Sequence, residues 1–84
     1  NYWSCNISDG SLNVFLNKGV WSDGRIEVYD ASGRLLQQSA INKAASAQTL
    51  RMPAGNLRQG LYLVKLVQPS GISTRKVVKG MSLN

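Results

Sequence analysis

Histidine is absent from this chain of 84 residues, acidic residues number four, and there is one cysteine. Metal sites in proteins usually draw on clusters of His, Cys, Asp or Glu, and the sequence has no such cluster with ligand spacing. Nucleophilic catalysis also needs a base beside the nucleophile, and histidine is the usual one. The composition therefore predicts no catalytic residues, no metal site and no cofactor, and it makes an enzyme the least favoured class.

Long apolar runs are also missing. No run approaches the ~20 residues that span a bilayer, and the chain starts without an initiator Met or the cationic and apolar segments of a signal peptide. We therefore expect Asn1 to be the cut edge of a longer chain. Cys5 cannot form an internal disulfide, so it is either a small buried hydrophobe or a free thiol near the chain end. The length predicts one domain over residues 1–84, with 1–9 as a linker or first strand and 80–84 as a tail.

The charge is unevenly distributed along the chain. The formal net charge is +6, yet all four acidic residues lie within the first 30 positions, and residues 31–84 hold eight basic residues and no acidic one. Such a balance favours an anionic partner: nucleic acid, a phosphorylated glycolipid or an acidic protein surface. The alternative is an ordinary excess of solvated Lys and Arg. Aromatic residues do not alternate with the basic ones, so the pattern does not favour nucleic-acid binding.

Hydrophobic residues recur with a period of two, which is typical of β-strands with one buried face. Leu12, Val14 and Leu16 alternate with more polar neighbours, and Ile26 and Val28 do the same between Arg25 and Glu27, which we expect to point outward. Further strands are predicted over residues 34–40, 48–52, 61–67 and 72–79, with a further candidate strand over 2–7. Residues 42–47 show no amphipathic stripe and are predicted to form a loop.

Turn signals separate these strands. Asp30-Ala31-Ser32-Gly33 can form a hairpin connection, since Asp30 can bond the backbone ahead of it and Gly33 can adopt a positive φ. This turn also explains the grouping of Tyr29, Asp30, Ser32 and Arg34 without any catalysis. Gln68-Pro69-Ser70-Gly71 is a second predicted hairpin turn. The connections are too short for crossover helices, so we predict an all-β fold, a small antiparallel sandwich of about seven strands.

The segment 61–67 is the strongest strand and carries apolar residues on both faces. Tyr62, Val64 and Leu66 form one face, whereas Leu61, Leu63, Lys65 and Val67 form the other. This pattern favours a central strand, or one whose outer face meets a partner. Phe15, Leu61 and Leu63 point away from the assigned core. Either a homodimer or the second sheet of the sandwich is expected to cover them.

The segment Leu57-Arg58-Gln59-Gly60-Leu61-Tyr62 resembles the tyrosine corner of immunoglobulin-like sandwiches. In that motif the phenol hydroxyl bonds to backbone a few residues upstream and holds the crossing between sheets. The resemblance makes Tyr62 a determinant of an immunoglobulin-like fold and not a ligand contact.

Three segments together resemble a known family: Ile26–Leu35 with its Tyr-Asp-x-x-Gly-Arg hairpin, Leu57–Leu66 with Leu-x-x-Gly-x-Tyr-x-Val-Lys, and the basic segment Ser73–Lys79. In order and spacing they are similar to the C-terminal sorting domain (type A) of the type IX, or Por, secretion system of Bacteroidota. The resemblance covers roughly residues 10–79. It implies a non-catalytic secretion signal, recognised by the outer-membrane translocon after export to the periplasm.

The resemblance also implies partners and a location. These are the type IX translocon, a surface sortase and attachment complex, and anionic lipopolysaccharide at the outer membrane or cell surface, with secretion as the other destination. A domain retained at the surface as an adhesive or scaffold sandwich, binding anionic lipopolysaccharide or polysaccharide through its basic face, is the alternative function. If the last strand lies at a sheet edge, we expect a receptor strand to dock there; the alternative is that its charges only guard an exposed edge against aggregation.

The candidate residues divide by role. The residues assigned to structure are Asp30, Gly33, Gly60, Tyr62 and Val64. The residues assigned to recognition by the translocon or another partner are Arg34, Lys65, Arg75, Lys76, Val77, Val78 and Lys79. Among the latter, the charged side chains are the better candidates for contact, because charged groups on strands usually face solvent.

Overall fold

The computed structural model describes residues 2–19, 21, 23–41 and 46–80. In these residues the chain forms seven strands: β1 (Trp3–Ser8), β2 (Ser11–Leu16), β3 (Arg25–Asp30), β4 (Leu35–Ala40), β5 (Gln48–Pro53), β6 (Gly60–Gln68) and β7 (Gly71–Lys79). The predicted all-β class is confirmed, and residues 3–8 form a strand and not a linker. Within the same ranges, the structure has no helix suited by length and hydropathy to crossing a membrane. Most of the predicted loop at 42–47 and of the predicted tail lies outside the described residues.

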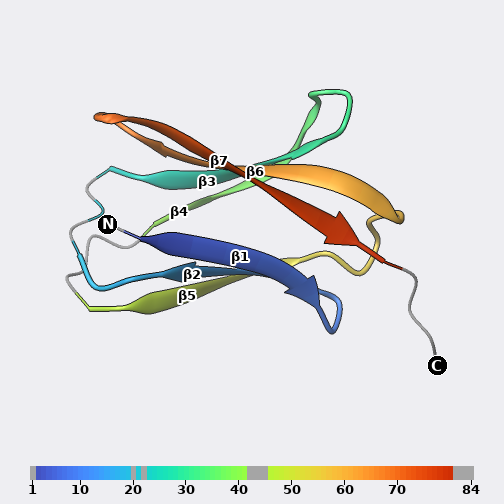
Figure 1. Cartoon of the computed structure of the whole chain (residues 1–84), viewed down its shortest axis with the longest axis horizontal. Helices are drawn as coiled ribbons and strands as arrows, with labels where there is room; N and C mark the ends of the chain where they lie inside the picture. Colours follow the sequence, from blue (N-terminus) through green and yellow to red (C-terminus); the bar gives the residue numbers. More distant parts are fainter. Residues whose placement is uncertain (1, 20, 22, 42–45, 81–84) are drawn as a thin grey trace.

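The strands form two antiparallel sheets packed face to face (Figure 1). One sheet has the order β1-β2-β5 and the other the order β4-β3-β6-β7. The pairings of β2 with β5 and of β3 with β6 are those of an immunoglobulin-like sandwich, which confirms the predicted architecture. In the constant-type immunoglobulin domain the fourth strand pairs with the fifth. Here β4 pairs with β3 because the Asp30–Gly33 turn returns the chain directly onto β3.

The core lies between the two sheets and follows the predicted alternation. Buried apolar side chains come from both inner faces and from the loops: Trp3, Leu12, Val14, Leu16, Trp21, Ile26, Val28, Ile41, Met52, Ala54, Tyr62, Val64, Leu66 and Val77. Leu50, which stands opposite the buried Val14, is half-buried against this cluster, as is Cys5. The thiol therefore behaves as a small hydrophobe of the core, the first of the two alternatives.

Two tryptophans complete the core. Trp21 is almost fully buried in the connection between β2 and β3, and its indole Nε1 donates a hydrogen bond to the Asn17 carbonyl oxygen at 2.9 Å. Trp3 is buried at the start of β1 and donates from Nε1 to the Ser73 hydroxyl of β7 at 3.1 Å. Trp3 follows the alternation of β1, whereas Trp21 lies between two strands, so only the folded chain shows that Trp21 belongs to the core.

The predicted turns are formed by the residues expected. The Gly33 N–H donates to the Asp30 carbonyl oxygen at 3.0 Å, and Gly33 has a φ of 92°, in the left-handed region that glycine tolerates best. In the second hairpin, Gln68 stands opposite Gly71, so Pro69 and Ser70 alone connect β6 to β7. This short connection makes β7 the direct neighbour of β6 along its full length.

Candidate functional site

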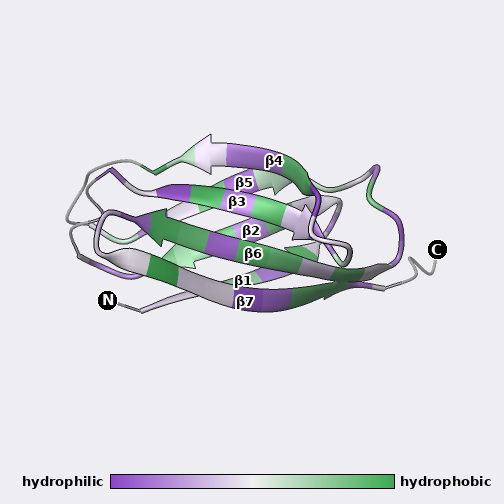
Figure 2. Cartoon of the chain, turned by 90° about the horizontal axis from the view of Figure 1, so that it is seen from above, coloured by the Kyte–Doolittle hydropathy of each residue, from purple (hydrophilic) through white to green (hydrophobic). Residues whose placement is uncertain are grey.

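The last strand, β7, lies at an edge of the four-stranded sheet. It pairs with β6 from Gly71 to Lys79, and no strand of the described residues pairs with its other side. An edge strand leaves alternate N–H and C=O groups without ladder partners and can accept an added strand. The sequence predicted docking only on the condition that the last strand lies at a sheet edge, and β7 meets this condition. Figure 2 shows β7 as the outermost ribbon, beside β6 and then β3.

The two faces of β7 have different surroundings. Cross-strand partners share a face, so Val78, which stands opposite the exposed Leu61, points outward, and Val77, which stands opposite the buried Tyr62, points inward. Ile72, Thr74 and Lys76 share the outward face with Val78 and are exposed. Ile72 and Val78 are 65% and 66% exposed. An aliphatic residue therefore stands toward each end of this face of β7, with Thr74 and Lys76 between them.

The inward residues of β7 correct the sequence-based assignment. Val77 belongs to the core and cannot contact a partner without unfolding. Lys79 is half-buried, and its Nζ donates to the carbonyl oxygens of Ala54 at 2.6 Å and Gly55 at 3.2 Å. The expectation that Lys79 presents its charge to solvent is therefore wrong for the ammonium group. The period of two explains both placements, since 77 and 79 share a face.

Arg75 also points toward the other sheet but remains exposed, because it lies near the edge of the sandwich. Its guanidinium carbon stands 5.1 Å from the ring centroid of Trp3 and 5.6 Å from that of Tyr2. Such cation–π contacts stabilise the pairing of a cation with an aromatic face. Arg75 thus connects β7 to β1, as the hydrogen bond between Trp3 and Ser73 does on the same strands.

Lys65 and Arg34 occupy separate places. Lys65 lies on the outer face of β6, opposite Thr74 of β7, and its Nζ stands 4.6 Å above the ring centroid of Tyr29. It is therefore part of the same surface as Lys76. Arg34 belongs to the turn before β4, at the opposite edge of the sheet, and its Nε is 3.3 Å from Asp30 Oδ2. The structure brings Lys65 and Lys76 together and leaves Arg34 apart from them.

We call the outward side chains of β6 and β7 the terminal face; its members are Leu61, Leu63, Lys65, Val67, Ile72, Thr74, Lys76 and Val78. The green and purple segments of β6 and β7 in Figure 2 show that these two strands contain both hydrophobic and hydrophilic residues. The alternation in β6 predicted one outer face for its residues, but Ile72 was not assigned to the same surface. The period of two along the strand contained this information, because Ile72, Lys76 and Val78 are separated by even numbers of positions and so share a face.

The second sheet of the sandwich does not cover Phe15, Leu61 or Leu63. Leu61 and Leu63 lie on the outer face of the four-stranded sheet, whereas Phe15 lies on the outer face of the three-stranded sheet. The expectation that the two sheets cover all three against each other is therefore wrong. Their positions on opposite outer faces also mean that one flat interface cannot cover all three.

A polar cluster on β3 adjoins the terminal face. Glu27 points to the outer face as expected, but it is nearly covered, because Arg25 Nε donates to its carboxylate at 2.8 Å and the Tyr29 hydroxyl does so at 2.6 Å. These two hydrogen bonds, the one from Tyr29 first, lower the pKa of Glu27. The hydrogen bond to Glu27 also raises the pKa of the Tyr29 hydroxyl. The carboxylate is held by its own neighbours and leaves the terminal face net positive.

The residues assigned to structure lie in turns, at a strand start or in the core. The Asp30 carboxylate accepts hydrogen bonds from the Ser32 hydroxyl at 2.6 Å and from the N–H groups of Ser32 and Arg34 at 3.0 Å. Gly60 has a φ of 147° where β6 begins, and Val64 is buried at the centre of that strand. The Tyr62 hydroxyl donates to the Arg58 carbonyl oxygen at 2.6 Å, the bond that a tyrosine corner requires.

Comparison with known proteins adds one finding. A family model described as a secretion system C-terminal sorting domain matches residues 6–80, which contain six of the seven strands in full and the second half of β1. No curated protein and no solved structure matches the chain.

Proposed function

Because the chain belongs to the family of secretion-system C-terminal sorting domains, we propose that it is a non-catalytic signal that directs its parent protein through the type IX system. The parent protein passes through the periplasm, and the outer-membrane translocon recognises the folded domain. A surface sortase and attachment complex acts next, and the parent protein reaches the cell surface or the medium. The residues that carry recognition belong to β7 and its neighbour β6.

The edge position of β7 is the observation that supports docking there. A receptor strand that adds to this edge gains the backbone hydrogen bonds that β7 leaves open. Lys76 and Lys65 on the terminal face add an electrostatic preference for an acidic receptor surface. Val78 and Ile72 supply apolar contact area on either side of the Lys76 charge.

The inward residues of β7 serve the same function indirectly. Lys79, Arg75 and Val77 each bind or pack against residues outside β7, and together they hold the strand against the sandwich. A strand held in one geometry loses less conformational entropy on docking than a free terminus would. We therefore assign recognition to Lys65, Lys76 and Val78, and positioning to Arg75, Val77 and Lys79.

The alternative function, a retained adhesive domain that binds anionic lipopolysaccharide through a basic face, has less support. Among the described basic residues, Arg51 lies on the three-stranded sheet, Arg34 pairs with Asp30, and Lys79 is occupied by carbonyl oxygens. The +8 balance of residues 31–84 is thus spread over both sheets and the turns. Of the basic residues that the structure describes within 31–84, Lys65 and Lys76 share one open face, and Arg25 of β3, which adjoins them, is paired with Glu27.

A charge reversal on β7 in the intact parent protein tests the proposed function. Lys76→Glu changes an exposed outward side chain without touching the core, whereas deletion of 74–79 would also remove Val77 and the Lys79 contacts. We expect the variant to reach the surface about tenfold less than the unaltered protein and to accumulate in the periplasm, because the introduced acid repels an acidic receptor. Cell fractionation with an antibody against the parent protein measures this.

Arg51→Glu is the matched control, since it makes the same charge change at an exposed position of β5 in the other sheet. Surface delivery of this control is expected to be normal. Thermal unfolding of both purified variants shows that each remains folded. Normal delivery of the Lys76→Glu protein, or an equal loss in the control, would refute the assignment of recognition to β7.

A further inference from the structure

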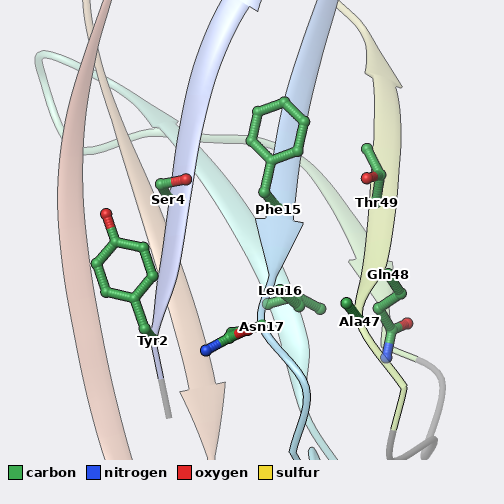
Figure 3. Close-up of a pocket in the computed structure, with 8 residues that line it drawn as sticks. All are labelled: Tyr2, Ser4, Phe15, Leu16, Asn17, Ala47, Gln48 and Thr49. Atoms are coloured by element: carbon green, nitrogen blue, oxygen red, sulfur yellow. The ribbon is translucent and has the colours of Figure 1, made fainter.

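The outer face of the three-stranded sheet has an exposed aromatic ring among small polar side chains. Phe15 stands on the central strand β2 and is 40% exposed. Its cross-strand neighbours are Ser4 on β1 and Thr49 on β5, which are too small to cover the ring from either side (Figure 3). Aromatic residues on a sheet commonly pair with aromatic or β-branched partners, and Thr49 is such a partner, but Ser4 leaves the other side of the ring open. Neither the core nor the terminal face explains a phenylalanine at this position.

Two hollows flank Phe15 on this face, and the ring lines both. The first has a volume of about 460 Å³ and is lined by Tyr2, Ser4, Asn17 and Thr49 in addition to Phe15. The second has a volume of about 280 Å³ and is lined by small polar side chains together with Asp9 and Arg51. The first volume lies within the ordinary range of small-molecule sites. An extended ligand can therefore occupy both hollows and pass over the ring.

Hydrogen bonds between the polar side chains around the second hollow hold these side chains in place. The Asn13 amide nitrogen donates to the Asn6 side-chain oxygen at 3.1 Å and to the Ser8 hydroxyl at 3.2 Å. At the far end of the face, Tyr2 is held by the Arg75 guanidinium, although its side chain remains 62% exposed. Groups that are positioned before binding lose less entropy when a ligand arrives.

The chemistry of this face excludes several ligand classes. Its strands pair with one another across the sheet, so the flat face offers no backbone groups to a peptide strand. Of the described residues that line the hollows, Arg51 alone is basic, and one basic residue is too few for a nucleic acid or polyanion. An apolar partner would leave the hydroxyl and amide groups buried without hydrogen bonds.

A neutral sugar chain fits what remains. One side of a pyranose ring presents C–H groups, which pack against the electron-rich face of an aromatic ring, and its hydroxyls bond to amide and hydroxyl side chains. We propose that the outer face of the β1-β2-β5 sheet is a binding site for a neutral oligosaccharide, with Phe15 as the platform on which one sugar ring stacks. Thr49 and Asn17 on one side, and Asn13 on the other, contact the neighbouring sugars.

An NMR titration of the full chain tests this site. The probes are three neutral hexasaccharides of different linkage: maltohexaose, cellohexaose and chitohexaose, each at up to about 10 mM, because weak sugar sites have a Kd on the order of 1 mM. At least one probe is expected to shift amide signals of β1, β2 and β5 and to leave those of β6 and β7 unchanged. Phe15→Ala is expected to weaken this binding about tenfold or more, since it removes the stacking platform.

Two further variants complete the design. Leu61→Ala removes a similarly exposed apolar side chain from the opposite face, so it is expected to bind as the unaltered chain does. Thr49→Val keeps the shape of the side chain and removes its hydroxyl, and it is expected to weaken binding even if Phe15→Ala fails to fold. Absence of shifts with all three probes, shifts centred on β6 and β7, or unchanged affinity in Thr49→Val would overturn the proposal.

Discussion

The hydroxyl of Tyr62 and the carbonyl oxygen of Arg58 lie 2.6 Å apart, across the connection that carries the chain from one sheet to the other. The bond joins the start of β6 to the loop before it, while the Tyr62 ring is buried in the core. One side chain thus fixes both the path of the crossing and the position of the strand that β7 pairs with. The geometry of the terminal face depends on this bond.

Tyr62→Phe is expected to lower the free energy of unfolding by about 1 to 2 kcal/mol, because it removes one hydrogen bond and leaves a partly buried carbonyl oxygen without its donor. The ring stays in the core, so the fold is expected to persist. Urea unfolding followed by tryptophan fluorescence measures the change. Tyr29→Phe is the comparison: its hydroxyl bonds to the Glu27 carboxylate, which keeps the hydrogen bond from Arg25 after the change, so a smaller loss is expected. An equal loss in both variants would contradict the role of the corner.

The Asp30 turn predicts a dependence of stability on acid. Hydrogen bonds from the Ser32 hydroxyl and from the backbone of Arg34 hold the pKa of Asp30 below its ordinary value. A carboxyl group with a lowered folded pKa stabilises the fold at pH values above its unfolded pKa of ~3.9, and this contribution is lost as the pH falls through the folded pKa. We therefore expect the Asp30 contribution to be complete at about pH 6 and absent at about pH 2.

Asp30→Asn isolates that contribution. The amide keeps an acceptor for Ser32 and Arg34 but does not titrate, so the stability difference between the unaltered chain and this variant should shrink as the pH is lowered. Urea unfolding of both proteins across the acid range measures the difference. A constant difference at every pH would show that the charge of Asp30 contributes nothing.

The sequence predicted the features that depend on residues close together in the chain. Alternation identified the inward residues of β2, β3 and β6, and the turn residues at Asp30–Gly33 acted as expected. The Tyr62 bond spans four residues, so a local pattern contains both partners. For these features the backbone periods and turn geometries are sufficient.

The features that the sequence missed depend on packing between distant segments. Lys79 lies 24 and 25 residues from the carbonyl groups that it binds, and Ser73 lies 70 residues from Trp3. The side chain of a strand residue can be assigned to a face by its parity, but what covers that face is decided by the whole fold. The sequence assigned Val77 and Lys79 to recognition because it did not show that their face of β7 packs against the core and the loop after β5.

The contrast between Lys79 and Lys76 gives a prediction about stability. Lys79→Met removes two hydrogen bonds from an ammonium group to backbone carbonyls and is expected to cost about 1 to 2 kcal/mol. Lys76→Met changes an exposed outward residue on the same strand and is expected to change stability by no more than about 0.5 kcal/mol. Chemical denaturation of the two variants measures this. Equal costs would show that Lys79 does not anchor β7 in solution.

Cys5 predicts the opposite response, a loss of stability in alkali. Burial raises the pKa of its thiol, and the nearby charge of Arg75 offsets this only in part. The neutral thiol is therefore favoured by the fold, and this contribution is fully present below the unfolded pKa of ~8.5 and is lost as the pH rises through the higher folded pKa. Between about pH 7 and about pH 9.5, the unaltered chain under reducing conditions should lose more stability than Cys5→Ala, which has no thiol to ionise. Since both proteins share every other alkaline titration, a parallel decline in the two would mean that the thiol ionises as freely in the folded chain as in the unfolded one.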